Sequence, residues 1–276
     1  MTPDDPPRRS SGSSPGSSED TASPYPETPD IETSSEDYAR RFAGPVGEYF
    51  LEAQLGTTLE LLTPWPDAGI LDVGGGHGQL AVPLVKRGFG VTVVGSREAG
   101  EDRLRRSLAP GSYTFCRGDL PRLPFGDRSF DVVVAVRLLP HVEQWQTLIA
   151  ELCRVAKHAV IVDYPDVRSV NVVSDRLFGL KKALEPNTRP YRCFRRSEIL
   201  AQFAEHGFGT PALRPQFTLP MVVHRVFRRA GFSRTVESAA RRLGLTACLG
   251  SPVIARFLRQ RDGSRDRSVS LPATGQ

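Results

Sequence analysis

The segment ILDVGGGHGQL, residues 70–80, constrains the fold of this chain more than any other stretch. It begins as a short apolar strand that ends near Asp72, and glycines follow at positions 74, 75, 76 and 78. Glycine has no Cβ, so this turn can adopt positive φ and bring backbone N–H groups close to a ligand. A helical pattern begins directly afterwards. The segment therefore predicts a strand-to-helix crossing of an open α/β sheet, where ligands bind beyond the carboxyl ends of the strands.

The spacing of the glycines separates two classes of ligand. A dinucleotide fingerprint reads G-x-G-x-x-G, which from Gly74 requires a glycine where the chain has Gln79. The pattern present is D-x-G-x-G-x-G. The carboxylate of Asp72 offers nothing to an anionic pyrophosphate, but it attracts a cationic ammonium or sulfonium group. The loop therefore favours S-adenosylmethionine (SAM) as the cofactor. A glycine-rich turn without a ligand is the alternative.

Three blocks in a fixed order resemble the class I SAM-dependent methyltransferases, in their bacterial type 11-like form. LDVGGGHG is similar to the first motif of that family. GDLPRLPFGDRSFDVVVAVRLLPHV, residues 118–142, and ELCRVAKHAVIVDYP, residues 151–165, are similar to the blocks that follow it. The resemblance covers about residues 44–208. It implies a Rossmann-like, doubly wound sheet of seven mostly parallel strands, with an antiparallel last strand.

The alternation of apolar and charged segments fits such a sheet. Strands are expected at residues 69–73, 90–95, 112–118, 131–136, 159–164, 211–219 and 251–258. Helices are expected at residues 79–87, 97–108, 142–155 and 197–208. Residues 221–246 are expected to form a basic, amphipathic helical insertion before the last strand. His224 precedes arginines in this insertion and is expected on the surface.

The methyltransferase domain is expected to span residues 37–260, between two polar tails. Residues 1–36 are rich in Ser, Pro and acids, so they bury too little apolar surface to offset their chain entropy, and we expect disorder. Residues 261–276 are expected to be disordered as well. Residues 37–62 predict two helices that pack on the sheet. Their aromatic side chains include three candidates for a lid over the site: Tyr38, Phe42 and Tyr49.

Charge and composition limit the partners of the chain. The net charge is +5, and residues 176–276 hold 19 Lys and Arg residues against six acids. This basic region favours an anionic substrate or peripheral contact with an anionic membrane. Because few aromatic residues are interleaved with its arginines, a nucleic-acid partner is not expected. The four cysteines are scattered, which predicts no metal site. Without an apolar N-terminal segment or a run of about 18 apolar residues, we expect a cytoplasmic protein.

The resemblance assigns cofactor contacts to residues at the strand ends. Asp72 orders the glycine loop and faces the methionine part of SAM, and Gly74, Gly75, Gly76 and Gly78 form the cradle. Asp119 accepts a hydrogen bond from the adenine amino group, with the N–H of Leu120 near the ring. The backbone carbonyl of Arg137 meets the ammonium group.

The second strand departs from the family pattern at its carboxyl end. The family has an acid there that accepts hydrogen bonds from the ribose hydroxyls, but this chain has Gly95. Ser96 is expected to bond a hydroxyl in its place, or Glu98 to reach back. The ribose contact is therefore expected from one of these two residues.

Candidate catalytic and substrate residues follow the fourth and fifth strands. His141 is a candidate general base, because an imidazole near neutral pKa can accept the proton that a nucleophile loses; a structural histidine is the equal alternative. Tyr164 is a second catalytic candidate. The substrate pocket is expected to contain four further residues: Asp166, Asn171, Arg189 and Tyr191.

These observations predict a methyltransferase that acts on an O, N or C nucleophile of a small molecule with anionic or lipid character. A methyltransferase of quinones or membrane lipids is the narrower alternative, with the basic insertion on the bilayer surface. Two alternatives come from other classes: a nicotinamide dehydrogenase, which the glycine spacing disfavours, and a non-catalytic binding module, which the missing acid at Gly95 favours.

Overall fold

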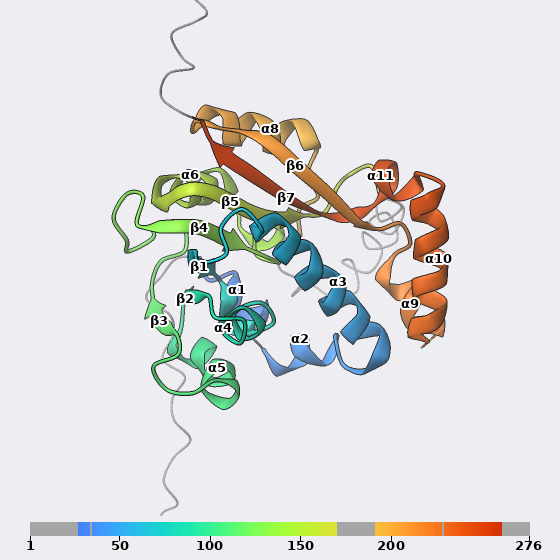
Figure 1. The fold of residues 1–276 in the computed structure, drawn as a ribbon, viewed down its shortest axis with the longest axis horizontal. Coiled ribbons are helices and arrows are strands. Elements are labelled where there is room, and N and C mark those ends of the chain that lie inside the picture. The colour runs from blue at the N-terminus through green and yellow to red at the C-terminus, as the bar shows by residue number, and fades with distance from the viewer. Residues whose placement is uncertain (1–26, 34, 170–190, 228, 261–276) are drawn as a thin grey trace, which may run out of the picture.

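The computed structural model describes residues 27–33, 35–169, 191–227 and 229–260. The described residues form one seven-stranded sheet with the strand order β3-β2-β1-β4-β5-β7-β6. The first five strands pair with one another in parallel, and β7 runs antiparallel to both β5 and β6. The expected seven-stranded sheet with an antiparallel last strand is confirmed (Figure 1).

The strands follow the apolar runs of the sequence. Their bounds are β1 Gly69–Val73, β2 Gly90–Gly95, β3 Thr114–Arg117, β4 Phe130–Ala135, β5 Ala156–Tyr164, β6 Phe208–Phe217 and β7 Ser251–Arg259. β6 starts three residues earlier than expected, because the preceding helix ends at Glu205 and Gly207 takes a positive φ of 73°. Glycine at this point is a common way to end a helix.

Helices cover both faces of the sheet and enclose two apolar cores. On one face lie α6 (Trp145–Val155) and α8 (Arg196–Glu205). On the other face lie α3 (Gly44–Leu62), α4 (Ala81–Val85) and α5 (Asp102–Ser107). The helix expected over residues 97–108 is divided, because a 3-10 turn, η2 (Glu98–Glu101), precedes α5. Burial on both faces explains why the central strands are almost entirely apolar.

Part of the N-terminal segment is ordered, contrary to the expectation for residues 1–36. Residues 27–33 are described and include the helix α1 (Asp30–Thr33), and α2 (Glu36–Arg40) begins before residue 37. α1 packs against the 3-10 turn η1 (Gly75–His77) of the glycine loop. Composition does not predict this helix, because Asp30, a polar residue, is buried in a specific hydrogen-bonded contact.

The basic insertion is helical, as expected, and it is attached through a buried polar cluster. It consists of α9 (Met221–Phe227), α10 (Ala230–Arg242) and α11 (Leu245–Leu249), which lie beside the start of α3 in Figure 1. Glu237 accepts the backbone N–H groups of Thr218 and Leu219, at 2.8 and 3.0 Å. His224 Nε2 lies 3.0 Å from Glu237 Oε1. His224, which we expected on the surface, is therefore fully buried and fixes α9 to α10.

Candidate functional site

The glycine loop lies at the carboxyl end of β1 and is shaped by two left-handed residues. Gly74 and Gly78 have φ values of 74° and 68°, which favour glycine because L side chains clash there. The N–H of Gly74 donates to the carbonyl of Val94 at 2.8 Å and so ties the loop to β2. A Cβ on Gly75 would overlap the Asp72 carboxylate, which lies directly beneath the loop. The loop conformation thus depends on glycine at three of the four predicted positions.

Asp72 is buried beneath the loop, and burial raises the pKa of its carboxyl group to about 7. Its Oδ2 atom has no hydrogen-bond partner among the described residues. A buried carboxylate without full partners is costly unless a positive charge compensates it. The site therefore fits a cationic ligand such as SAM better than an anionic one.

The end of β2 differs from the expectation that Ser96 bonds a ribose hydroxyl. Ser96 is fully buried, its hydroxyl donates to Asp30 Oδ1, and its backbone N–H donates to Asp30 Oδ2 at 2.8 Å. The hydroxyl proton of Ser96 is therefore engaged with Asp30. Glu98, the other candidate, is exposed at the start of η2. The sequence reasoning missed Asp30 because it lies 66 residues away in the chain.

Asp119 follows β3, which pairs with the end of β2. Its Oδ1 is buried without a hydrogen-bond partner among the described residues, so a donor from a ligand would satisfy it. Leu120 has its side chain in the apolar core. A contribution of Leu120 to a ligand is thus limited to its backbone.

Arg137 lies where the glycine loop meets the ends of β4 and β5. Its φ is 61°, an unusual value for a residue other than glycine. Its backbone N–H donates to Asp163 Oδ1 at 2.6 Å, and its side chain donates to Gln79 Oε1. The guanidinium lies 3.9 Å from the centroid of the Phe42 ring. Burial lowers the pKa of Arg137, and burial raises that of Asp163 to about 6.

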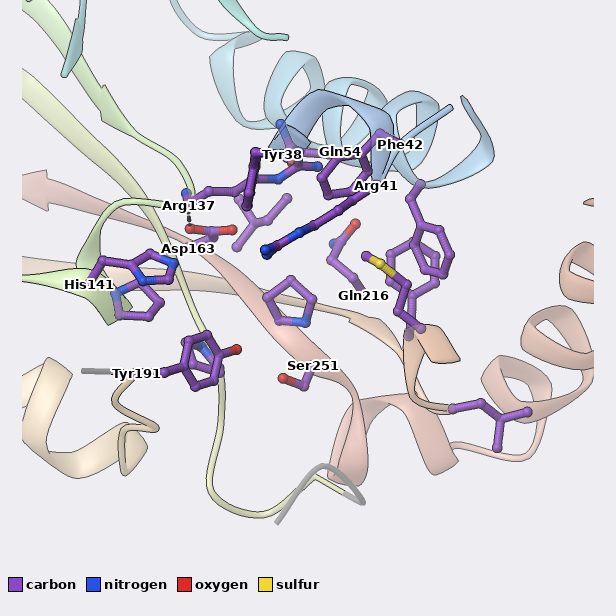
Figure 2. Close-up of a pocket in the computed structure, with 18 residues that line it drawn as sticks. Tyr38, Arg41, Phe42, Gln54, Arg137, His141, Asp163, Tyr191, Gln216 and Ser251 are labelled. Carbon is purple, nitrogen blue, oxygen red and sulfur yellow. Dashed lines mark hydrogen bonds between the residues drawn. The ribbon is translucent and has the colours of Figure 1, made fainter. Parts of the chain in front are cut away.

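A largely apolar cavity of about 400 Å³ opens beside Arg137, as Figure 2 shows. Tyr38 and Phe42 line one side, and His141 and Tyr191 line the other, with their rings 5.6 Å apart. Two of the three lid candidates therefore line the cavity. Tyr49 does not line it and packs instead against Phe217, with ring centroids 5.7 Å apart.

The structure contradicts the expectations for two candidates at the carboxyl end of β5. Tyr164 is fully buried in the core against Phe194, and burial raises its pKa to about 12. Asp166 is also buried; it bonds Arg196 Nε at 2.7 Å and the N–H of Arg168 at 2.9 Å. Neither residue lines the cavity. Asn171 and Arg189 lie outside the described residues.

Sequence reasoning missed several polar residues of the cavity. Besides Asp163, they are Arg41, Gln54, Gln216 and Ser251. Asp163 had a usable signal, because side chains alternate between the two faces of a strand. Asp163 and Tyr164 therefore point to opposite faces, and the cavity is on the face of Asp163. Gln54 and Gln216 lie on α3 and β6, and nothing local in the sequence distinguishes them.

Within residues 27–33, 35–169, 191–227 and 229–260, no group of three or more His, Cys, Asp or Glu side chains is arranged to hold a metal ion. No helix in the same ranges combines the length and apolar character needed to cross a membrane.

Residues 70–159 match the family model described as "Methyltransferase domain". A 109-residue stretch, 38% of this chain, is 32% identical to phthiotriol/phenolphthiotriol dimycocerosates methyltransferase 1 of Mycobacterium ulcerans, and it spans 40% of that protein.

Two solved structures are similar in fold. One is magnesium protoporphyrin IX methyltransferase from Synechocystis PCC 6803 with bound SAH (S-adenosylhomocysteine), with 19% identity, 81% of this chain and 94% of that chain covered, and a TM-score of 0.56. The other is a SAM-dependent methyltransferase, possible histamine N-methyltransferase, from Thermotoga maritima, with 19% identity, 84% and 99% covered, and a TM-score of 0.59. Residues 70–159 therefore match the methyltransferase-domain family model, and they lie within a sheet that has the same fold as these SAM-dependent methyltransferases.

Proposed function

We propose that this chain is a SAM-dependent methyltransferase that methylates an O, N or C nucleophile of a small molecule with a large apolar part. One juxtaposition carries the proposal. Arg137 contacts Gln79 beside the glycine loop and Asp163 beside the apolar cavity. A cofactor over the loop and an acceptor in the cavity would meet at this residue.

The strand ends offer groups that suit SAM. The carboxylates of Asp72 and Asp119 and the backbone of Gly74, Gly76 and Leu120 would hold it. When bound, SAM supplies a methyl group on a positively charged sulfur. Asp72 compensates positive charge, because its carboxylate is buried and incompletely bonded. Asp119 accepts a donor from the base.

The cavity residues would orient the acceptor and exclude water. Phe42, Phe50 and Phe217 give the cavity an apolar wall, which fits an aromatic or lipid-like acceptor. His141 remains the candidate base, since it lines the cavity and an imidazole can take up a proton at neutral pH. Alignment of the two reactants supplies much of the rate in such a reaction.

A membrane-borne acceptor is the narrower form of this proposal. On α9, Val226 and Phe227 are 72% and 51% exposed, next to Arg225 and close to Arg229. Exposed apolar side chains beside arginines suit the surface of an anionic bilayer. The Mycobacterium ulcerans relative, a lipid methyltransferase by its name, supports a lipid acceptor.

Methyl transfer from labelled SAM tests the proposal. The purified full chain is incubated with SAM carrying a tritiated methyl group and with an extract of small molecules, which is then divided into aqueous and organic phases. We expect label in a product of the organic phase, together with release of SAH. His141→Gln should reduce product formation while SAM still binds. A chain that binds SAM but labels no product in either phase would contradict the enzymatic function.

A further inference from the structure

Asp30 is a buried carboxylate at the carboxyl end of β2. It lies on α1, its exposed fraction is 2%, and both of its oxygens face Ser96. Removing a carboxylate from water is costly unless hydrogen bonds replace the lost hydration. Ser96 provides two such bonds, from its N–H and from its hydroxyl. The chain therefore places a negative charge of its N-terminal segment at the cofactor side of the sheet.

The position of this carboxylate is related to Gly95, the last residue of β2. A Cβ on Gly95 would lie 3.2 Å from Phe115 Cζ and 3.3 Å from Asp30 Oδ2. An acidic side chain that started from position 95 would thus enter the space that the Asp30 carboxylate holds. The glycine at the strand end and the acid on α1 are complementary, because one leaves the room that the other fills.

The same place is close to the glycine loop. α1 packs against η1, and the N–H of Gly74 bonds the carbonyl of Val94, one residue before Gly95. A ribose hydroxyl that donates to a carboxylate forms a hydrogen bond to a charged acceptor, which is the stronger kind.

We propose that Asp30 supplies, from the N-terminal helix α1, the carboxylate that accepts the ribose hydroxyls of the cofactor in place of an acid on β2. This inference rests on the proposed function. It makes α1 a wall of the cofactor site, and it makes Asp30 a binding residue although it lies far from the methyltransferase motifs in the sequence.

Calorimetric titration of the full chain with SAH provides the first test. Asp30→Asn and Asp30→Ala should weaken SAH binding by about 10- to 100-fold, the range expected when a charged hydrogen-bond partner is lost. The matched control is Asp102→Asn, which removes an exposed carboxylate from the helix α5. It should leave the affinity unchanged. Thermal unfolding of each variant shows whether the fold is intact.

A ligand without the ribose hydroxyls separates recognition from anchoring of α1. The unmodified chain should bind 2′,3′-dideoxy-SAH about 10- to 100-fold more weakly than SAH, while Asp30→Ala should bind the two ligands about equally. The comparison of SAH with its dideoxy form uses the unmodified chain, so its result does not depend on whether a variant folds. Equal losses for both ligands on Asp30→Ala would mean that Asp30 merely holds α1 in place, and this would overturn the inference.

A second-site variant tests the spatial relationship directly. In the Asp30→Ala background, Gly95→Asp places a carboxylate near the vacated space, so part of the lost SAH affinity should return. Tighter binding by Asp30→Ala alone would mean that α1 blocks the site, and it would overturn the inference. No SAH or SAM binding by the unmodified chain would refute the proposed function itself. Binding that is unaffected by Asp30→Ala would refute this inference alone.

Discussion

The carboxylate of Asp163 accepts the backbone N–H of Arg137 at 2.6 Å, and this bond joins the ends of β4 and β5 beside the cavity. It also holds Arg137 at its unusual φ of 61°. Two buried groups of opposite chemistry thus stabilise one another: a backbone donor outside the regular ladder, and a carboxylate whose pKa burial raises to about 6.

Asp163→Ala should lower the free energy of unfolding by about 1–3 kcal/mol, because it leaves the Arg137 N–H without its acceptor. Asp163→Asn keeps an oxygen acceptor and should recover most of this loss. Urea denaturation at pH 8 measures both. Equal stability of Asp163→Ala and the unmodified chain would show that the bond does not hold this turn.

Gly75→Ala should destabilise the glycine loop, because the new Cβ would overlap the Asp72 carboxylate. Overpacking of this kind costs about 1–3 kcal/mol. Gly56→Ala is the matched control, since Gly56 lies in the exposed part of α3 with nothing within 4 Å of its Cβ position. That change should stabilise the helix by about 0.5–1 kcal/mol. Thermal unfolding compares the two, and a Gly75→Ala chain as stable as the unmodified chain would exclude the overlap.

Ligand binding should depend on pH through Asp72. Its pKa of about 7 in the folded chain exceeds the ordinary 3.8, so its contribution to stability is present at low pH and is lost as the pH rises through 7. A cationic ligand favours the ionised form. SAH, which carries an ammonium group, should therefore bind up to about tenfold more tightly at pH 8 than at pH 6.

Two controls isolate Asp72 from Asp163, which titrates nearby. Methylthioadenosine lacks the ammonium group, so its affinity should change little between pH 6 and pH 8. Asp72→Asn should remove the dependence seen with SAH. If the pH dependence of SAH binding persists in Asp72→Asn, another group is responsible, and Asp72 does not face the cation.

Tyr164→Phe should leave SAH binding and methyl transfer unchanged. The Tyr164 hydroxyl is buried without a hydrogen-bond partner among the described residues, so its removal should keep or slightly raise the melting temperature. Calorimetry with SAH and thermal unfolding check both expectations. Loss of methyl transfer in a well-folded Tyr164→Phe chain would restore the catalytic assignment that the structure contradicts.

Local sequence patterns predicted most of the fold and part of the site. The apolar runs located β1, β2, β4 and β5, because strands buried on both faces must be apolar along their length. The glycine loop located the strand-to-helix crossing, because positive φ restricts the residue type. These features depend on residues that are neighbours in the sequence, so the sequence alone predicts them.

The remaining features depend on contacts between distant segments. Asp30 bonds Ser96, which lies 66 residues away in the sequence. The polar composition of the N-terminal segment therefore gave no sign of this buried contact. His224 was expected on the surface because it precedes arginines, but Glu237 and Ser233 bury it from α10. The sequence analysis chose Tyr164 as a site residue, whereas the structure places Asp163 in the cavity. The two residues lie on opposite faces of β5, and only the structure shows which face meets the cavity.

Calorimetric titration of the full chain with SAM is the most direct test of the account. We predict saturable binding of SAM, no binding of NADH, and a loss of about 1–3 kcal/mol of SAM binding free energy in Asp119→Ala, which removes an acceptor at the end of β3. Absence of heat with SAM at high micromolar concentration, by a chain that unfolds cooperatively, would contradict the central claim.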